Sequence, residues 1–172
     1  MMFSLTPIVV QVLVPFVESI STRVTGWKPN WFEVEAFRVI TDDTRGVGTM
    51  SDETKATVMT EATVKVHIDG ERQIATAEGN GPVNALDRAL RSALDGRFPF
   101  LERVHLTDYK VRVLDTNKGT GAVTRVLIDS TDGDKTWTTI GVNENIIEAS
   151  WQALLDSIHF GLLRSEATGT AS

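Results

Sequence analysis

The chain carries the same strand–turn–helix pattern twice, and this internal repeat limits the folds that are open to it. The first copy covers residues 79–90 and the second covers residues 141–154. In each copy a strand-like run ends at a glycine-containing turn, after which an amphipathic helix begins. A shift of 64 residues places Ala85, Ala89, Leu90 and Leu94 of the first helix on Ala149, Ala153, Leu154 and Ile158 of the second.

The repeat puts the N-termini of two helices in related positions, which suggests a binding site. The first backbone N–H groups of a helix have no partner within the helix, and the helix dipole favours negative charge there. Such an end can hold a small anion, for example the carboxylate of an amino acid. The pattern therefore indicates binding rather than catalysis.

The composition limits the size and the class of the protein. A chain of 172 residues with 41% hydrophobic residues can form one domain or two small halves with a real core. Its net charge of −6 comes without a Lys/Arg cluster, so we expect no nucleic-acid partner. The absence of cysteine excludes disulfides, cysteine-bound zinc and thiol catalysis, and it fits a cytoplasmic protein.

Residues 1–30 form an apolar N-terminal segment, which we interpret as a linker or as a surface for a partner. The first basic residue is Arg23, so the basic start of a signal peptide is missing. A membrane span needs about 20 apolar residues, and here the apolar run is interrupted earlier. We therefore expect no membrane role. The interrupting residues are Pro7, Gln11, Pro15 and Glu18.

The apolar periodicity predicts an α+β fold of two βββα units, residues 31–96 and 97–163, with antiparallel sheets and helices on one face. Asp69-Gly70 predicts a hairpin turn. Residues 41–57 are typical of a long polar loop, and residues 164–172 of a flexible tail. The predicted strands are residues 31–40, 64–68, 72–77, 106–114, 122–128 and 136–142, and the predicted helices are residues 83–94 and 146–162.

The sequence shows no pattern of a catalytic or metal site. The histidines His67, His105 and His159 lack the spacing of metal ligands, and we interpret them as surface or strand-end residues. No GxSxG motif or P-loop occurs. We expect no catalytic residue, no metal and no cofactor. The aspartates in turn-like stretches, where Asp accepts backbone hydrogen bonds, are Asp42, Asp43, Asp115, Asp132 and Asp134.

Each of the two turns has a structural interpretation as well. Residues 79–82 (GNGP) can be a tight strand-to-helix connection that needs a positive φ. The second turn favours binding, because Asn143 and Asn145 can cap the last helix while offering side-chain amides to a ligand. Trp137 and Trp151 are interpreted as core or interface anchors, which would supply apolar area to a dimer.

Three motifs, in this order, resemble the C-terminal regulatory domain of the 2-isopropylmalate synthase family. They are EGNGPVNALD at residues 78–87, DYKVRVL at 108–114 and GVNENIIEASW at 141–151. The resemblance covers about residues 31–163. It is strongest to the citramalate synthase branch of the family, where the second motif and the IIEASW run are typical.

The resemblance implies a homodimer that binds a branched-chain amino acid as a feedback inhibitor. The effector is leucine for isopropylmalate synthases and isoleucine for many citramalate synthases, so the closer branch favours isoleucine here. Carried over by motif, the effector-binding residues would be Gly79, Asn80, Gly81, Val83 and Asn84 at the first turn, Asn143, Glu144 and Asn145 at the second, and Leu106 and Tyr109 around the apolar side chain.

The sequence departs from the family in two respects. The 41–57 loop looks longer than the family pattern and residues 1–27 do not match it clearly, and the catalytic unit is absent. The family's catalytic unit is a TIM barrel with an HxH metal motif, and a barrel needs about 250 residues. We therefore expect a detached or truncated regulatory domain, whose partner could be a separate catalytic synthase chain. The alternatives are a dimerisation or scaffold domain without ligand binding and, third, an enzyme that uses a carboxylate not identified here.

Overall fold

A computed structural model describes residues 31–42, 59–114, 119 and 121–167. The chain divides into two compact units, of which the first is Asn30–Arg97 and the second contains Phe98–Ser172. Each unit has one three-stranded antiparallel sheet followed by one helix, which confirms the predicted α+β fold of two βββα units. Most of the predicted loop, the N-terminal segment, Asp43 and Asp115 lie outside the described residues.

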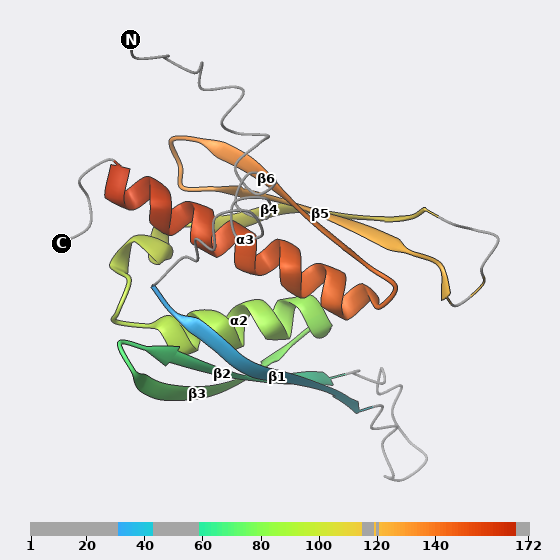
Figure 1. The fold of residues 1–172 in the computed structure, drawn as a ribbon, viewed down its shortest axis with the longest axis horizontal. Coiled ribbons are helices and arrows are strands. Elements are labelled where there is room, and N and C mark those ends of the chain that lie inside the picture. Colours follow the sequence, from blue (N-terminus) through green and yellow to red (C-terminus); the bar gives the residue numbers. More distant parts are fainter. Residues whose placement is uncertain (1–30, 43–58, 115–118, 120, 168–172) are drawn as a thin grey trace, which may run out of the picture. The chain divides into compact units, whose positions relative to one another are not determined.

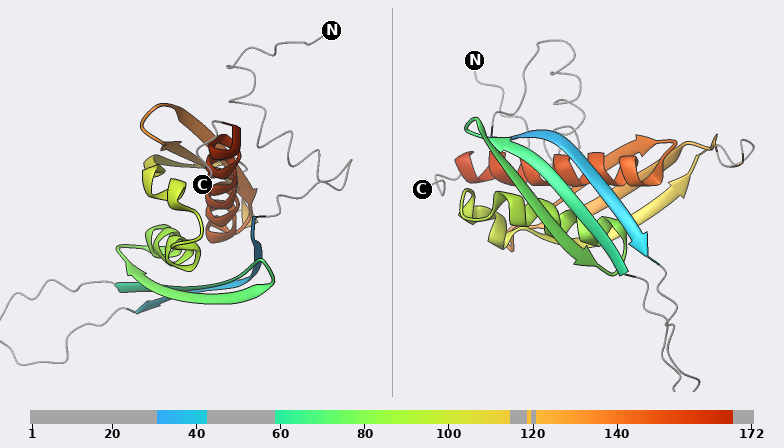
Figure 2. Two further views of the ribbon diagram at one scale, coloured as in Figure 1. Left: turned by 90° about the vertical axis from the view of Figure 1, so that its left-hand side faces the viewer. Right: turned by 90° about the horizontal axis from the view of Figure 1, so that it is seen from below.

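The first unit consists of β1 (Glu33–Asp42), β2 (Met59–Ile68), β3 (Glu71–Gly79) and α2 (Pro82–Leu94). The strands pair in the order β1-β2-β3, with each neighbour antiparallel. Figure 1 shows α2 lying along one face of this sheet, and its contacts are mainly with β2 and β3. We call the face of this sheet that points away from α2 its outer face, and the right-hand view of Figure 2 shows it.

Local sequence signals account for the turns and the helix of this unit. Asp69 and Gly70 have φ angles of 51° and 80°, which is the conformation of a tight primed hairpin turn and confirms the prediction. Pro82 stands at the start of α2, and Gly96 (φ 70°) follows its end. The predicted apolar stripe of α2 is buried against the alternating apolar residues of β2; the stripe is Leu86, Ala89, Leu90, Ala93 and Leu94.

The second unit contains the short 3-10 helix η1 (Pro99–Arg103), β4 (His105–Val113), β5 (Thr124–Thr131), β6 (Thr136–Asn143) and α3 (Ile146–Ala167). Its strands pair in the order β4-β5-β6, again antiparallel. The helix α3 packs on β5 and β6 and also contacts η1. Periodicity did not predict η1, because a single 3-10 turn is too short to show a repeat.

Each of the two sheets has a β-bulge at the equivalent position of its first strand. A register shift lies between Val34 and Ala36 in β1, and a second one lies between Leu106 and Asp108 in β4. After the bulge Phe37 faces Val64 in the first sheet, and in the second Tyr109 faces Ile128. Residues of β1 therefore correspond to residues of β4 that are 72 positions later, whereas later elements correspond at a shift of 64. This equivalence allows a position-by-position comparison of the units.

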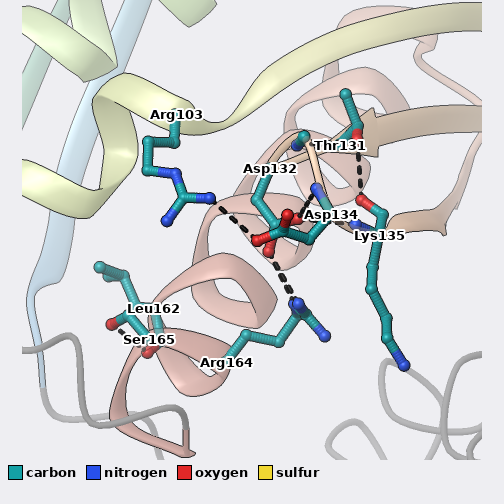
Figure 3. Close-up of polar contacts among 9 residues, drawn as sticks. Arg103, Thr131, Asp132, Asp134, Lys135, Leu162, Arg164 and Ser165 are labelled. Carbon is teal, nitrogen blue, oxygen red and sulfur yellow. Dashed lines mark hydrogen bonds and ion pairs between the residues drawn. The ribbon is translucent and has the colours of Figure 1, made fainter.

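The last helix extends to Ala167, so the predicted tail begins too early at residue 164. Figure 3 shows the reason: the Arg164 guanidinium donates two hydrogen bonds, of 3.0 and 2.8 Å, to Oδ2 of Asp132. The other carboxylate oxygen of Asp132 accepts the backbone N–H groups of Asp134 and Lys135. Arg103 of η1 also pairs with Asp134, at 2.9 Å. The Arg164 contacts hold the end of α3 against the β5–β6 hairpin, and the Arg103 contact holds η1 against it.

The role predicted for Asp132, as an acceptor of backbone hydrogen bonds in a turn, is confirmed. Burial by itself raises the pKa of this carboxyl, but the hydrogen bonds from the Lys135 backbone, Arg164 and the Asp134 backbone outweigh it. The net result is a pKa below the usual value, so Asp132 is ionised at neutral pH. The first unit has a buried isoleucine, Ile68, at the equivalent position.

Two tryptophans among the described residues of the second unit belong to its core. Trp137 and Trp151 are buried within the chain, so their interpretation as core anchors is confirmed, and they leave almost no exposed area for an interface. The Trp137 indole donates to the Ser157 hydroxyl, which donates to Ser130. His159 lies within α3 and is half-buried, with its Nε2 shielded from solvent, so its interpretation as a surface or strand-end residue is wrong. This burial lowers its pKa to about 4.

Candidate functional site

Gly79 ends β3 and is buried where the chain turns into α2. A Cβ atom at this position would lie only 2.5 Å from the backbone nitrogen of Ala85. Glycine is therefore needed because the strand end and the helix approach closely. The expected positive φ is not the reason, since the positive-φ glycines among the described residues are Gly70, Gly96, Gly119 and Gly133.

The N-terminus of α2 has no side-chain cap. Gly81 is the capping residue, with extended backbone angles (φ −179°, ψ 173°) and no side chain that could accept a hydrogen bond. Asn84 does not cap the helix either, because its Oδ1 accepts the backbone N–H of Asn80 at 3.3 Å. The first N–H groups of α2 therefore lack a side-chain acceptor, which is the arrangement that favours a bound anion.

The N-terminus of α3 differs from that of α2, because the side chain of Asn145 caps it. Oδ1 of Asn145 accepts the backbone N–H groups of Ile147 and Glu148, at 2.8 and 3.4 Å, so the predicted capping role of Asn145 is confirmed. Oδ1 of Asn143 accepts the N–H of Asn145 and so braces the turn. The exposed Glu144 lies between them. The two turns are therefore not equivalent for an anionic ligand.

Leu106 and Tyr109 lie on the face of β4 that is turned towards α3, opposite Ser130 and Ile128 of β5. Ser150 was not predicted as part of the site, yet its Oγ lies 2.8 Å from the Tyr109 hydroxyl. Ser150 donates its proton to the carbonyl of Ile146 at 2.6 Å, so the Tyr109 hydroxyl is the donor in the pair. This chain of hydrogen bonds joins Tyr109 to the first turn of α3.

The repeat contains a signal that would have identified Ser150. The positions equivalent to Tyr109 and Ser150 in the first unit hold Phe37 and Leu86. The first unit therefore has an apolar pair where the second unit has a hydrogen-bonded pair, and the two units differ at both positions of the pair. The ten predicted residues fall into two groups: residues 79–84 lie in the first unit, and the other five residues lie in the second.

The part of the chain that the structure describes contains no group of three or more acidic or histidine residues placed to hold a metal ion. In the same residues no helix is both long and apolar enough to cross a membrane. The first unit offers backbone N–H donors at the start of α2, which suit a carboxylate. The second unit, taken by itself, offers the carboxamides of its turn and a tyrosine hydroxyl held by a serine.

Comparison with known families places this repeated βββα architecture in a class of regulatory and dimerisation modules. Residues 17–162 match the LeuA allosteric (dimerisation) domain. The chain therefore belongs to the family of LeuA allosteric (dimerisation) domains, as its sequence motifs suggested.

The relatives are longer enzymes that contain such a domain. The chain is 53% identical over 135 residues to an (R)-citramalate synthase of Streptomyces coelicolor, a match that covers 78% of this chain and 24% of that protein. It is 43% identical over 152 residues to an (R)-citramalate synthase of Aquifex aeolicus, covering 88% and 27%. A 2-isopropylmalate synthase of Aquifex aeolicus is 37% identical over 105 residues, covering 61% and 19%. The chain thus spans about a quarter of the length of these two citramalate synthases.

Proposed function

We propose that this domain binds a branched-chain amino acid and transmits feedback control to a citramalate or 2-isopropylmalate synthase in the cytoplasm. The observation that carries the proposal is the difference between the two helix starts. Asn145 occupies the N–H groups at the start of α3, whereas Gly81 leaves those of α2 without a side-chain acceptor. The effector carboxylate is therefore assigned to the start of α2, at residues 81–84.

The electrostatics of this helix start also favour the proposal. The first turn of α2 contains no acidic residue that would repel a carboxylate. Asp87 is one turn further on, and its carboxylate pairs with Arg91 at 2.9 Å. An effector carboxylate would thus meet the positive end of the helix dipole without a competing negative charge in that turn.

Isoleucine is the proposed effector, with leucine as the alternative. The two amino acids differ in the position of one methyl branch, a difference worth about 1–3 kcal/mol in an apolar pocket. The citramalate synthases among the relatives are 53% and 43% identical to this chain, and the 2-isopropylmalate synthase is 37% identical. This order favours the effector that the resemblance implies for the citramalate branch.

Regulation would follow from linkage between effector binding and the state of a two-fold homodimer. An effector shifts a conformational equilibrium only as far as its affinities for the two states differ, typically by about 1–3 kcal/mol. A catalytic synthase region associated with the dimer would respond to that shift. Light scattering at micromolar concentration should give the dimer mass, and a monomer would contradict this part of the proposal.

Calorimetric titration with isoleucine, leucine, valine and norvaline tests the effector directly. The decisive variant is Gly81→Asp, which places a carboxylate where the effector carboxylate is assigned. A side chain at Gly81 meets nothing within 4 Å, and the extended backbone suits any residue, so the variant should fold.

The two interpretations of the turn predict different results for this variant. Asp is also a better N-cap than Gly by a few tenths of a kcal/mol, so stability should stay equal or rise slightly. Binding should be abolished in Gly81→Asp and retained in the matched control Gly81→Ala. If the folded wild-type protein binds none of the four amino acids below millimolar concentration, the domain is a dimerisation module without an effector.

A further inference from the structure

The outer face of the first sheet contains a hollow of about 220 Å³. Its lining residues are Ala36, Phe37, Arg38, Thr63 and Lys65. Arg38 is paired with Thr63 and Ala36 with Lys65, so the two cationic residues stand in neighbouring rows of the sheet. Thr63 and Lys65 alternate along β2 with the buried Val64 and Val66, so the hollow lies on the sheet face opposite α2.

In the second sheet, the cation at the position of Arg38 is neutralised by carboxylates. Lys110 of β4 is the counterpart of Arg38, because both stand in the same place after the bulge. Lys110 forms ion pairs with Asp108 on its own strand and with Asp129 on β5, the latter at 3.5 Å. The hydrogen bond to Asp108 is the main cause that raises the pKa of Lys110. The cation therefore has two carboxylate partners.

In the first sheet both of these carboxylates are replaced. Ala36 stands at the position of Asp108, and Lys65 stands at the position of Asp129. Both replaced positions line the hollow. Within the described residues neither Arg38 nor Lys65 forms an ion pair. The two residues are diagonal neighbours across β1 and β2, a spacing that long side chains can bridge to reach one shared anion. Ala36 and Lys65 thus leave Arg38 without the two carboxylates that Lys110 has, Lys65 adds a second positive charge, and both residues line the hollow.

One carboxylate of the outer face, that of Glu35, is already engaged. Glu35 accepts two hydrogen bonds from the Arg72 guanidinium, at 2.6 and 2.7 Å, and its Oε2 lies 3.0 Å from Nε2 of His67. The Arg72 hydrogen bond is the main cause that lowers the pKa of Glu35 to about 2. Glu35 is therefore committed to its own cluster and does not neutralise the hollow.

We propose that this hollow is a binding site for a small dianion of the phosphate class, held by Arg38 and Lys65. A guanidinium fork matches phosphate oxygens in geometry, and an ammonium adds a second positive charge. The Thr63 hydroxyl, which is 2.9 Å from that of Thr76, supplies a polar group at the same wall. Pockets for drug-sized ligands measure roughly 300–1,000 Å³, so this one fits an ion or the phosphate group of a larger ligand. The site is independent of the proposed amino-acid site.

The test is a titration of the full chain with inorganic phosphate at constant ionic strength, followed by calorimetry and by the melting temperature. Phosphate should bind and raise the melting temperature more than chloride does. Lys65→Asp restores the carboxylate that the second sheet has at this place, and it should weaken phosphate binding by at least about tenfold because it gives Arg38 an internal partner. Ala36→Asp, at the position of Asp108, should have the same effect and provides a second variant if the first folds poorly.

Arg125→Asp is the matched control. Arg125 lies opposite Arg112 on the second sheet, outside the hollow, and this substitution changes the net charge by the same amount. It should leave phosphate binding intact. The proposal is overturned if phosphate has no effect beyond that of chloride, or if Lys65→Asp and Arg125→Asp weaken binding equally. Glucose 6-phosphate at the same ionic strength then distinguishes a site for a phosphate monoester from a site for free phosphate only.

Discussion

Replacing Gly141 by alanine should destabilise the second unit strongly. Gly141 lies in β6 directly beneath α3, and a Cβ atom built there would lie 1.8 Å from the carbonyl oxygen of Ala149 and 3.1 Å from the nitrogen of Ala153. Ordinary contacts begin at 3.4 Å, so the helix and the strand would have to separate by more than an ångström. Both clashing atoms belong to the backbone, so no side-chain rotation can relieve the overlap.

The cost can be worked out from the contacts that such a separation would break. Overpacking a core costs about 1–3 kcal/mol even where side chains can adjust. The Thr139 hydroxyl donates to the Ala153 carbonyl at 2.6 Å, and a broken buried hydrogen bond adds about 1–3 kcal/mol. We therefore expect a loss of about 2–6 kcal/mol, a large part of the roughly 5–15 kcal/mol that stabilises a typical domain.

Urea unfolding followed by tryptophan fluorescence measures this loss, since Trp137 and Trp151 are both buried in the second unit. Gly81→Ala is the control, because nothing lies within 4 Å of its Cβ position, and we expect a change below about 1 kcal/mol. A Gly141→Ala protein within about 1 kcal/mol of wild type would show that α3 and β6 do not approach as closely as described.

Two further substitutions test the polar contacts of the second unit. Asp132→Asn should lower the free energy of unfolding by about 1.5–3 kcal/mol at pH 7, because it removes the charge that Arg164 contacts. The control Asp134→Asn, at an exposed ion pair, should change it by less than about 0.5 kcal/mol. The folded state lowers the pKa of Asp132, so the stability that its charge contributes is fully present above the unfolded pKa of about 3.9 and is lost as the pH falls through the folded pKa. The unfolding free energies of wild type and Asp132→Asn should therefore converge in acid. A difference that stays constant with pH would contradict this. Ser150→Ala should weaken effector binding because Ser150 holds the Tyr109 hydroxyl. In a double-mutant cycle with Tyr109→Phe the two losses of binding free energy should be non-additive by at least about 0.5 kcal/mol. Additive losses would mean that Ser150 does not act through Tyr109.

Much of the fold follows from short-range patterns in the sequence. Val64, Val66 and Ile68 alternate with polar residues and form a half-buried strand, because successive side chains of a strand point to opposite faces. Asp69-Gly70 forms the hairpin turn, because glycine readily adopts the positive φ that this turn requires. The order of strands and helices, the two units and the family motifs all depend on such local signals.

The end of α3 and the environment of His159 could not be predicted in this way. Arg164 remains helical because Asp132, far away in the sequence, accepts its hydrogen bonds. His159 has its pKa lowered by burial in the folded chain, and no neighbouring residue in the sequence indicates that burial.

The predicted site residues show the same division. The sequence itself determined that Gly79 and Asn145 stand at strand-to-helix turns, because glycine and asparagine at those positions are local signals. Only the tertiary structure decided that Gly79 is needed for close approach, that α3 is capped while α2 is open, and that Arg38 lacks the carboxylates that Lys110 has. The physical reason is that these properties depend on strand register and on the distance between helix and sheet, and both are set by packing between residues that are far apart in the chain.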